Sequence, residues 1–379
     1  MRHRRITIGA LAALASLALA ACGSSSSSSS SSVPSPSGSS SSSSAPSPTP
    51  SGSSGSATIN GAGSTFAAPI YQQWGSNLSS KGLTVNYSAV GSGAGIAQLQ
   101  AGTVDFAGDD AAVKSSEQAA AKGPIAQFPI GFGGITVSYN LSGVKSGLKL
   151  DGPTIADIFL GKIKTWNDPA IKALNPGLSL PSTSITVVHR SDASGTTKGF
   201  TTFLSDYSPA WTAAAGKADK TVKWPTGTGA KGNSGVAAAV KQTGGAIGYV
   251  EQAYALQNNF SFAAVKNKAG KFVLPTLAAA SAAAAGIAVP ANLTISTINS
   301  PSAGAYPITS QTFLDVYKDM CKAGVSQSAA SAVKKFITYG LSAGQQVVSQ
   351  LAYAPLPSAL VSKDMAQVSS LTCNGSPLQ

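Results

Sequence analysis

The sequence of 379 residues has few charged side chains, few cysteines and few histidines, and each shortage argues against a class of protein. Asp, Glu, Lys and Arg together make up 11% of the chain, against roughly 25% in an average soluble protein. Three cysteines are too few for a disulfide-dense scaffold. The two histidines, His3 and His189, argue against a zinc site of the usual His/Cys spacing and against a multi-histidine catalytic centre. We therefore expect neither a metal nor a cofactor.

The composition also limits the partners of the chain. Apolar residues make up 43% of it, which is enough to bury a sizeable core, so a wholly disordered chain is excluded. The formal net charge is +12, but beyond Arg2, Arg4 and Arg5 the basic residues are scattered singly, with no basic arm or Arg/Lys-rich helix. This pattern argues against nucleic-acid binding and favours the attraction of small anions.

Residues 1–22 have the pattern of a secretory signal. A basic start is followed by an apolar stretch from Ile6 to Ala21, which is too short to span a bilayer comfortably. The sequence Leu-Ala-Ala-Cys, which ends at Cys22, resembles a bacterial lipobox, in which the cysteine is lipidated and becomes the new N-terminus. An ordinary signal peptide with an accidental cysteine is the alternative.

Residues 23–57 consist almost entirely of Ser, Pro and Gly, and we expect them to form a disordered linker. Together with the signal, this linker predicts a folded body that is tethered by lipid to the outer face of the cytoplasmic membrane. Cys321 and Cys373 would then lie in an oxidising compartment and would form one disulfide. Two free thiols are the alternative.

The folded body begins with two turns that combine glycine and serine. Residues 61–66 (GAGSTF) precede apolar residues at every fourth position, Phe66, Ile70, Trp74 and Leu78, which predict a helix with Ser64 and Thr65 at its N-cap. Residues 91–95 (GSGAG) lie between a predicted strand over 83–90 and a predicted helix from Ile96 onward. Each turn is either a simple helix cap or a site where N–H groups and hydroxyls face an anion at the positive end of a helix dipole.

Two further turns add charged side chains. A predicted strand over 104–108 runs into Asp109 and Asp110, which are either solvated or stand beside an anion site. A predicted strand over 185–190 ends at Arg190 and is followed by SDASGT (191–196) and by a helix that carries Phe200, Phe203 and Leu204. Arg190 supplies a planar fork of donors suited to an oxyanion, and Ser194, Gly195 and Thr196 supply hydroxyls and N–H groups at a helix start.

These residues resemble the phosphate-binding lipoproteins that act as solute-binding proteins of high-affinity, Pst-type phosphate ABC transporters. The resemblance covers most of the body from about 58 to 313, whereas the part from 314 onward resembles the family only loosely and the alanine-rich segment 276–286 has little family character. The matching stretches are GAGSTFAAPIY (61–71), VNYSAVGSGAGIAQ (85–98), TVDFAGDDA (103–111), IADIFLGKIKTWNDPAIKALNPGLSLP (155–181), ITVVHRSDASGTT (185–197), TVKWPTGTGAKGNSGVAAAV (221–240), GAIGYVEQAYALQNN (245–259) and YPITSQTF (306–313).

The resemblance implies an α/β protein with the two-domain periplasmic-binding-protein fold (type II-like) and a ligand cleft between the domains. Domain I would be discontinuous, formed by 58–131 and 306–379, and domain II would be 132–305. The phosphate-binding residues that it implies are Thr65, Phe66, Ser92, Asp110, Arg190, Ser194, Gly195 and Thr196. Ser64, Asp109 and Asp192 would support them, with Asp192 orienting Arg190 through a salt bridge.

The sequence departs from the family pattern at two positions of this site. Gly93 stands where members often carry a second Ser, and Asp109 stands where the residue before the acceptor is commonly small and uncharged. The second departure leaves open whether Asp109 or Asp110 faces the ligand.

The expected function is extracytoplasmic binding of inorganic phosphate by a monomer and delivery to the membrane permease subunits of an ABC importer. A carboxylate in a donor-lined cleft accepts a hydrogen bond from phosphate, which keeps a proton near neutral pH, and repels sulfate, which keeps none. The first alternative is a phosphate sensor that is not coupled to transport. A secreted hydrolase is a distant third, because His189 would be the only histidine left for a triad and no Gly-x-Ser-x-Gly elbow occurs, so we expect no enzyme.

Overall fold

The computed structural model describes residues 56–378. The predicted signal peptide, the predicted lipidation site Cys22 and the predicted linker up to residue 55 lie outside the described residues. The first strand begins at Ala57, which the sequence analysis placed at the end of the linker.

The largest sheet has nine strands in the order β2-β1-β3-β12-β4-β8-β6-β7, with β9 paired to β4. Its strands are β1 (Ala57–Gly63), β2 (Leu83–Ala89), β3 (Phe106–Asp109), β4 (Ile125–Tyr139), β6 (Thr186–Arg190), β7 (Thr228–Ala230), β8 (Ala246–Glu251), β9 (Ser261–Phe262) and β12 (Thr309–Tyr317). Two small sheets contain β5 (Lys149–Leu150), β10 (Ala264–Lys266), β11 (Phe272–Val273), β13 (Thr372–Cys373) and β14 (Ser376–Pro377).

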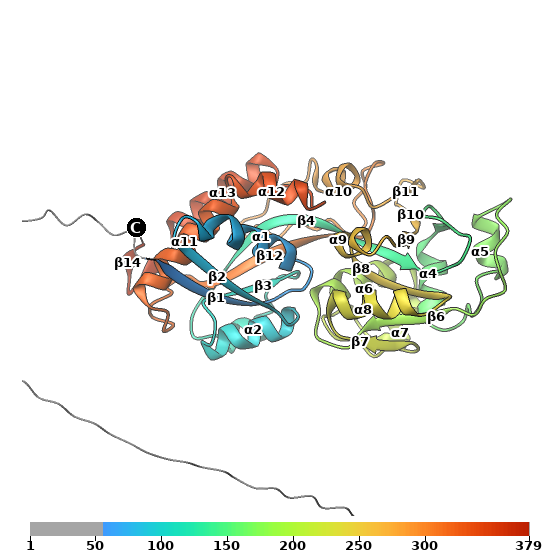
Figure 1. The fold of residues 1–379 in the computed structure, drawn as a ribbon, viewed down its shortest axis with the longest axis horizontal. Coiled ribbons are helices and arrows are strands. Elements are labelled where there is room, and N and C mark those ends of the chain that lie inside the picture. Colours follow the sequence, from blue (N-terminus) through green and yellow to red (C-terminus); the bar gives the residue numbers. More distant parts are fainter. Residues whose placement is uncertain (1–55, 379) are drawn as a thin grey trace, which may run out of the picture. The chain divides into compact units, whose positions relative to one another are not determined.

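Strand β4 joins the two halves of this sheet (Figure 1). Up to Gly134 it pairs antiparallel with β12, and from Ile135 it pairs antiparallel with β8. Other pairs within the halves are parallel: β1 with β2 and β3 in one half, and β6 with β7 and β8 in the other. The pair of β3 and β12 is antiparallel. The limits of the two domains, 58–131 with 306–379 and 132–305, stay a prediction.

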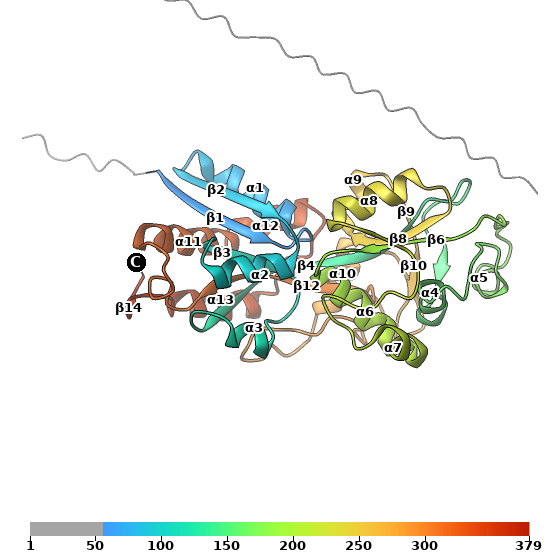
Figure 2. The same ribbon diagram turned by 90° about the horizontal axis from the view of Figure 1, so that it is seen from below.

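Helices cover the faces of both halves. Figure 2 shows α8 and α9 on one side of the strands β6 and β8, and α4, α6 and α7 on the other. The helices are α1 (Ala68–Ser79), α2 (Ser92–Ala101), α3 (Ser115–Ala119), α4 (Gly152–Phe159), α5 (Pro169–Leu174), α6 (Gly195–Tyr207), α7 (Pro209–Ala215), α8 (Gly232–Gln242), α9 (Gln252–Gln257), α10 (Leu277–Ala284), α11 (Gln327–Gly340), α12 (Gly344–Gln350) and α13 (Ser358–Ser369).

Buried aromatic side chains hold the helices on the sheet. In the first half Tyr71 and Trp74 of α1 pack against Phe336 of α11, with ring centroids 6.2 and 5.7 Å away. In the second half Phe200 of α6 stacks on Tyr249 of β8 at 4.4 Å. The periodic pattern of Ile70, Trp74 and Leu78 therefore marks a real buried face, although Phe66 lies before the helix.

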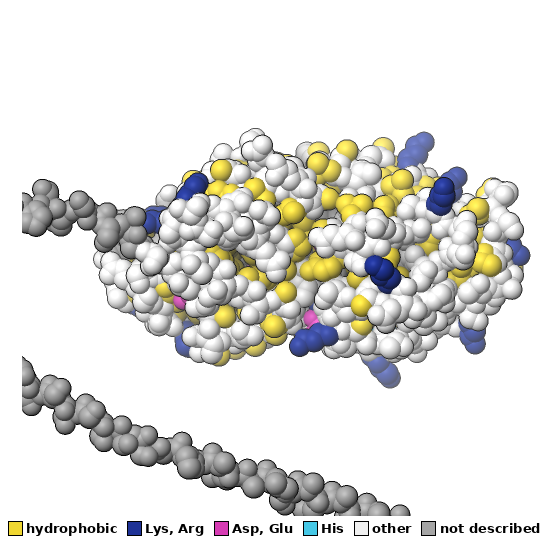
Figure 3. Space-filling model, in the orientation of Figure 1, with side chains coloured by type: hydrophobic (Ala, Val, Ile, Leu, Met, Phe, Trp, Pro, Cys, Tyr) yellow, Lys and Arg dark blue, Asp and Glu magenta, His cyan; other side chains and the backbone are white. Residues whose placement is uncertain are grey.

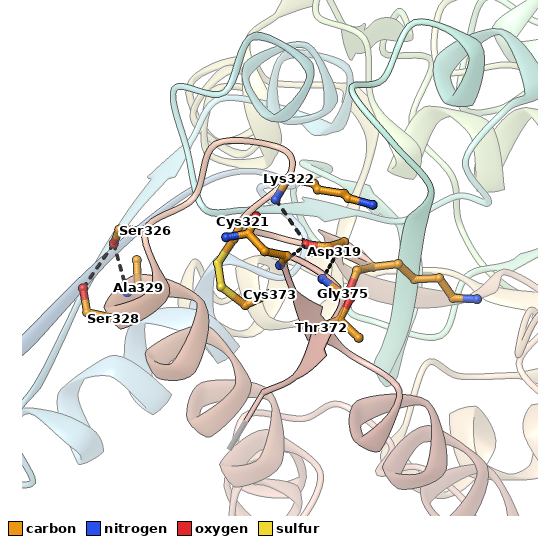
Figure 4. The surroundings of a disulfide bond; sticks show 11 residues. Asp319, Cys321, Lys322, Ser326, Ser328, Ala329, Thr372, Cys373 and Gly375 are labelled. Carbon is orange, nitrogen blue, oxygen red and sulfur yellow. Dashed lines mark hydrogen bonds between the residues drawn. A yellow bond between two sulfur atoms is a disulfide. The ribbon is translucent and has the colours of Figure 1, made fainter.

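Two other regions bear on expectations from the sequence. The alanine-rich segment forms α10, which buries Ala279, Ala280, Ala283 and Ala284. Cys321 and Cys373 lie together as a pair with their Cα atoms 4.7 Å apart (Figure 4). Beside them, the Asp319 carboxylate accepts hydrogen bonds from the backbone N–H groups of Lys322, Asn374 and Gly375.

The surface agrees with the scattered basic residues of the sequence. On the face shown in Figure 3, the Lys and Arg side chains lie apart from one another and form no continuous basic patch. Within residues 56–378 no helix is both long and apolar enough to cross a bilayer.

Candidate functional site

The first turn, between β1 and α1, directs a buried hydroxyl at a carboxylate. The Ser64 hydroxyl donates to Asp110 Oδ1 at 2.5 Å and accepts a bond from Ala67 N at 3.1 Å. The N-cap of α1 is Ala67, so the prediction that Ser64 and Thr65 occupy that position is wrong by two to three residues. The Ser64 hydroxyl still satisfies one free N–H of the helix start, which explains why the sequence pattern looked like a cap.

The second turn brings α2 to the same carboxylate. Helix α2 begins at Ser92, four residues earlier than the sequence predicted, because Gly91 adopts a φ of +98° that favours glycine and lets the helix start there. The Ser92 hydroxyl accepts a bond from Gly195 N at 3.2 Å and donates to Asp110 Oδ2 at 3.4 Å. One hydroxyl thus links the second turn, the fourth turn and Asp110.

Asp110 is the centre of a cluster of donors. Besides Ser64 and Ser92, Thr312 of β12 donates its hydroxyl to Asp110 Oδ1 at 2.8 Å. Burial raises the pKa of Asp110 to about 7, the bond from Ser64 opposes this, and the nearby charge of Asp109 adds to it. A buried carboxylate without a direct cation partner is costly, so this position is suited to share a proton with a ligand.

Asp109 is directed to a different set of partners. Its carboxylate accepts bonds from Lys220 Nζ at 2.5 Å and from the backbone N–H of Asp110 at 2.7 Å. Lys220 also donates to Glu117 Oε1 at 2.9 Å. Burial alone lowers the pKa of Lys220, but the charges of Asp109 and Glu117 raise it above its ordinary value, so the lysine stays charged. In this ion cluster, which consists of Lys220, Asp109 and Glu117, one lysine is shared by two carboxylates.

Arg190 and Asp192 form a forked pair at the fourth turn. Arg190 Nε donates to Asp192 Oδ1 at 2.9 Å and Nη2 donates to Oδ2 at 2.5 Å, while Nη1 donates to Thr196 Oγ1 at 3.3 Å. Burial alone would raise the pKa of Asp192, but the bonds and charge of Arg190 hold it below its usual value. The supporting salt bridge expected from the sequence is present, and it fixes the guanidinium plane.

The start of α6 lies directly against Asp110. Ser194 is the N-cap of this helix and accepts a bond from Thr197 N at 3.2 Å. A Cβ added at Gly195 would lie 2.6 Å from Asp110 Cβ, so only glycine permits this approach. The positive end of α6 therefore faces the buried carboxylate.

The structure explains the glycine at position 93. A Cβ at Gly93 would lie 2.5 Å from Ala193 Cβ, and Gly93 N donates to Ala193 O at 3.0 Å. The second turn and the fourth turn are thus in contact at this point. The side chain missing from Gly93 leaves room for the methyl group of Ala193.

Sequence reasoning missed three residues of this region, namely Thr312, Lys220 and Asn233. Asn233 of α8 donates from its backbone N and from Nδ2 to Thr65 Oγ1, at 3.1 and 2.8 Å. Thr312 and Asn233 lie inside stretches that matched the family, but no local pattern marks them. Only the pairing of β12 beside β3 and the position of α8 bring them to the site.

His189 is not arranged as a catalytic base. Its ring stacks on Trp224 with centroids 4.5 Å apart, and Nδ1 lies 3.0 Å from the carbonyl oxygen of Arg190. Burial lowers its pKa below the ordinary value. Within residues 56–378 there is no group of three His, Cys, Asp or Glu side chains that could hold a metal ion.

A cavity of about 300 Å³ lies beside Asp110, and Lys198, Thr202 and Ser310 form part of its lining. Among the predicted ligand residues only Asp110 borders it. The others, Thr65, Phe66, Ser92, Arg190, Ser194, Gly195 and Thr196, are buried where the turns meet.

Comparison with known proteins finds relatives that match most of the chain. A model of the PBP superfamily domain matches residues 48–343. The phosphate-binding protein PstS of Xylella fastidiosa (strain Temecula1) is 43% identical over 312 residues, which cover 81% of this chain and 83% of that protein. The PstS of Pasteurella multocida is 43% identical over 314 residues, covering 82% and 89% of the two chains.

Solved structures agree on the fold. A high-affinity periplasmic phosphate-binding protein (PfluDING), solved with bound phosphate, superposes with a TM-score of 0.68 at 24% identity, covering 84% of this chain and 96% of the other. The predicted α/β class and two-domain periplasmic-binding-protein fold are confirmed.

Proposed function

The chain belongs to the PBP superfamily and, within it, to the PstS phosphate-binding proteins, and on this basis we propose that it binds inorganic phosphate outside the cytoplasm and delivers it to an ABC importer. The relatives that share most of its length are named as binding proteins, and we propose that this chain likewise has no enzymatic activity.

One observation carries the proposal. Asp110 is a buried acceptor, and it lies among N–H groups and hydroxyls that can donate hydrogen bonds to an oxyanion. We assign Asp110 as the acceptor for the proton of phosphate, because its carboxylate lies in the cluster of Ser64, Ser92 and Thr312. We assign Thr65, Phe66, Ser92, Arg190, Ser194, Gly195 and Thr196, which lie on the turns that meet there, as the other phosphate-binding residues.

The same arrangement accounts for selectivity. Phosphate carries a proton near neutral pH and can donate it to Asp110, whereas sulfate has none to donate and would leave a buried acceptor facing a negative oxygen. An unpaired buried acceptor and like-charge repulsion together cost several kcal/mol, by general estimates of about 1–3 kcal/mol for each lost bond and more for a charge. Phosphate should therefore bind and sulfate should not compete.

The charged side chains around the site, Arg190 and Lys220 against four acids, do not by themselves favour an anion. Arg190 is shared with Asp192, so much of the stabilisation comes from N–H groups and hydroxyls at helix starts. The charge of Asp109 is partly offset by Lys220, which Asp109 shares with Glu117.

We propose the cellular arrangement on the sequence pattern. Cys22 would carry the lipid anchor, residues 23–57 would act as a flexible tether, and the folded part would act as a monomer on the outer face of the cytoplasmic membrane. Cys321 and Cys373 would form a disulfide there, for which the short distance between their Cα atoms gives geometric support.

Titration calorimetry of the full chain with phosphate and with sulfate tests the proposal. We expect one phosphate per chain and no heat with sulfate. Arg190→Ala should weaken phosphate binding by more than tenfold, about 1.4 kcal/mol, because it removes a charge-assisted donor and leaves Asp192 unpaired near the anion.

Lys162→Ala is the matched control, because Lys162 pairs with Asp157 at the exposed surface, and it should bind phosphate as the unaltered protein does. Absence of heat with phosphate would contradict the proposed function. A loss below tenfold in Arg190→Ala would contradict the role of Arg190 alone.

A further inference from the structure

Asn233 joins two of the predicted phosphate donors, although it is not among them. It is the second residue of α8 and is fully buried. Its side chain lies between Thr65 of the first turn and Thr196 of the fourth turn. These two threonines lie 131 residues apart in the chain, and they follow strands in different halves of the sheet, β1 and β6.

The orientation of the Asn233 amide is set by a backbone group. Glu251 N donates to Asn233 Oδ1 at 2.9 Å. A backbone N–H can only donate, so the atom that it meets is the amide oxygen. The NH₂ group of Asn233 therefore faces the two threonines.

This NH₂ group determines what the Thr65 hydroxyl can do. Thr65 Oγ1 accepts one bond from Asn233 N at 3.1 Å and another from Asn233 Nδ2 at 2.8 Å. A hydroxyl has two acceptor lone pairs and one proton. With both lone pairs occupied, Thr65 can meet a further group only by donating its proton.

The Thr196 hydroxyl likewise has both of its acceptor positions occupied. Its Oγ1 accepts from Arg190 Nη1 at 3.3 Å and from Asn233 Nδ2 at 3.4 Å. Both acceptor positions are again occupied by donors that cannot accept a proton. Its proton is therefore free to point at an anion.

We propose that Asn233 is a positioning residue that makes the hydroxyls of Thr65 and Thr196 donors toward the bound anion. The proposal rests on the proposed phosphate site and adds to it the group that sets the direction of two of its hydrogen bonds. A hydroxyl that is free to rotate loses part of its donor strength to alternative orientations, and Asn233 removes those alternatives.

Asn233→Asp tests this role, because aspartate has nearly the same shape but a carboxylate accepts where the amide donates. It would draw the protons of both threonines to itself and add a negative charge beside the anion. We expect phosphate affinity, measured by calorimetry on the full chain, to fall by about 100-fold or more.

Asn267→Asp is the matched control. Asn267 is also buried and also makes three bonds, donating from Nδ2 to Ala303 O and Ala305 O at 3.0 and 3.1 Å and accepting from Lys271 N at 3.0 Å. It contacts none of the predicted phosphate residues. Its change should lower thermal stability and leave phosphate affinity within threefold of the unaltered protein.

A double-substitution cycle separates positioning from a purely structural role. In a Thr65→Ser background, where the hydroxyl is kept, Asn233→Ala should lower phosphate affinity by as much as it does in the unaltered protein. It should cost at least threefold less in a Thr65→Val background, where no hydroxyl remains to orient. Equal costs in the two backgrounds would show that Asn233 acts on the fold and would overturn the proposal.

The outcomes also separate this proposal from the proposed function. If the unaltered protein binds no phosphate, the proposed function fails and the role of Asn233 fails with it. If the unaltered protein binds phosphate and Asn233→Asp binds within threefold of it, only the role of Asn233 is overturned.

Discussion

The surroundings of Asp109 and Asp110 differ sharply, although Asp109 ends β3 and Asp110 is the next residue. Asp109 lies in an ion cluster with Lys220 and Glu117, and its charge is partly compensated. Asp110 lies among the hydroxyls of Ser64, Ser92 and Thr312, and no lysine or arginine of the described residues forms a salt bridge with it. Successive side chains of an extended chain point to opposite faces, so adjacent acids can serve different purposes.

The difference explains how the proposed binding site could contain two acids and still take an anion. A buried carboxylate that has a lysine partner forms a structural ion pair, and it has less charge to direct at a ligand. A buried carboxylate that has only hydroxyl partners keeps acceptor capacity for a proton on the ligand. Lys220 comes from the loop before β7, whereas Asp109 ends β3 of the first half and Glu117 lies on the nearby helix α3. The ion cluster therefore also joins the two halves.

The largest effect that we expect comes from Lys220→Met. It removes the cation and leaves Asp109, which is fully buried, without a charge partner. Removing one partner of a buried pair costs about 3–5 kcal/mol, and urea denaturation in phosphate-free buffer should show a loss of this size. The double variant Asp109→Asn with Lys220→Met should recover most of it. A loss below about 1 kcal/mol would show that the ion cluster contributes little to the stability of the fold.

The pH dependence of stability should distinguish the two acids. The pKa of Asp110 is raised to about 7 in the folded protein, so between pH 5 and pH 7 the folded state holds a proton that the unfolded state has lost. This contribution is present at low pH and is lost as the pH rises toward 7, at about 1 kcal/mol per pH unit. Asp110→Asn should therefore flatten the decline in the free energy of unfolding over this range. An unchanged slope in the Asn variant would argue that Asp110 is already ionised at pH 5.

Sulfate competition should identify the acid that faces the ligand. In Asp110→Asn the amide can turn its NH₂ group toward any oxyanion, so sulfate should gain affinity by about tenfold or more while phosphate binds about as well or modestly worse. In Asp109→Asn sulfate should stay unable to compete. Competition that appears in the Asp109 variant and not in the Asp110 variant would reverse the two roles.

Thr312→Val tests the hydroxyl cluster with a smaller change. The substitution keeps the shape of the side chain but removes the bond to Asp110 Oδ1 and the bond to Asp109 O. We expect the free energy of unfolding to fall by about 1 kcal/mol, and phosphate affinity to fall by severalfold because Asp110 becomes less well oriented. Thermal melts with and without phosphate measure both effects. A variant that matches the unaltered protein in both melts would remove Thr312 from the cluster.

The smallest effect should come from Lys114→Met. Lys114 forms a salt bridge with Asp219, next in sequence to Lys220, but both side chains are about two-fifths exposed. Exposed pairs of this kind contribute about 0.2–1 kcal/mol, less in salt. The change in unfolding free energy should therefore be several times smaller than that of Lys220→Met. A comparable loss would show that burial does not explain the strength of the ion cluster.

Local sequence features predicted much of the fold and part of the site. Alternating and four-residue patterns located β2, β6, α1 and α6, because such patterns follow from which face of an element is buried. The salt bridge between Arg190 and Asp192 was expected from the family resemblance, and it is present. The starts of α1 and α2 were predicted less well, because a positive φ at Gly91 and a hydroxyl bond from outside the helix set them.

The turns could be read from the sequence alone. It showed which residues follow each strand, and it showed that these residues carry hydroxyls, N–H groups and charges suited to an anion. Only the tertiary structure decided which side chains complete them. Thr312, Lys220 and Asn233 lie 202, 111 and 168 residues from the partners that they contact, Asp110, Asp109 and Thr65. No local pattern records such contacts, because they depend on which strands pair and how the two halves of the sheet meet. The physical reason is that local structure follows from neighbours in the chain, whereas burial and its electrostatic consequences follow from neighbours in space.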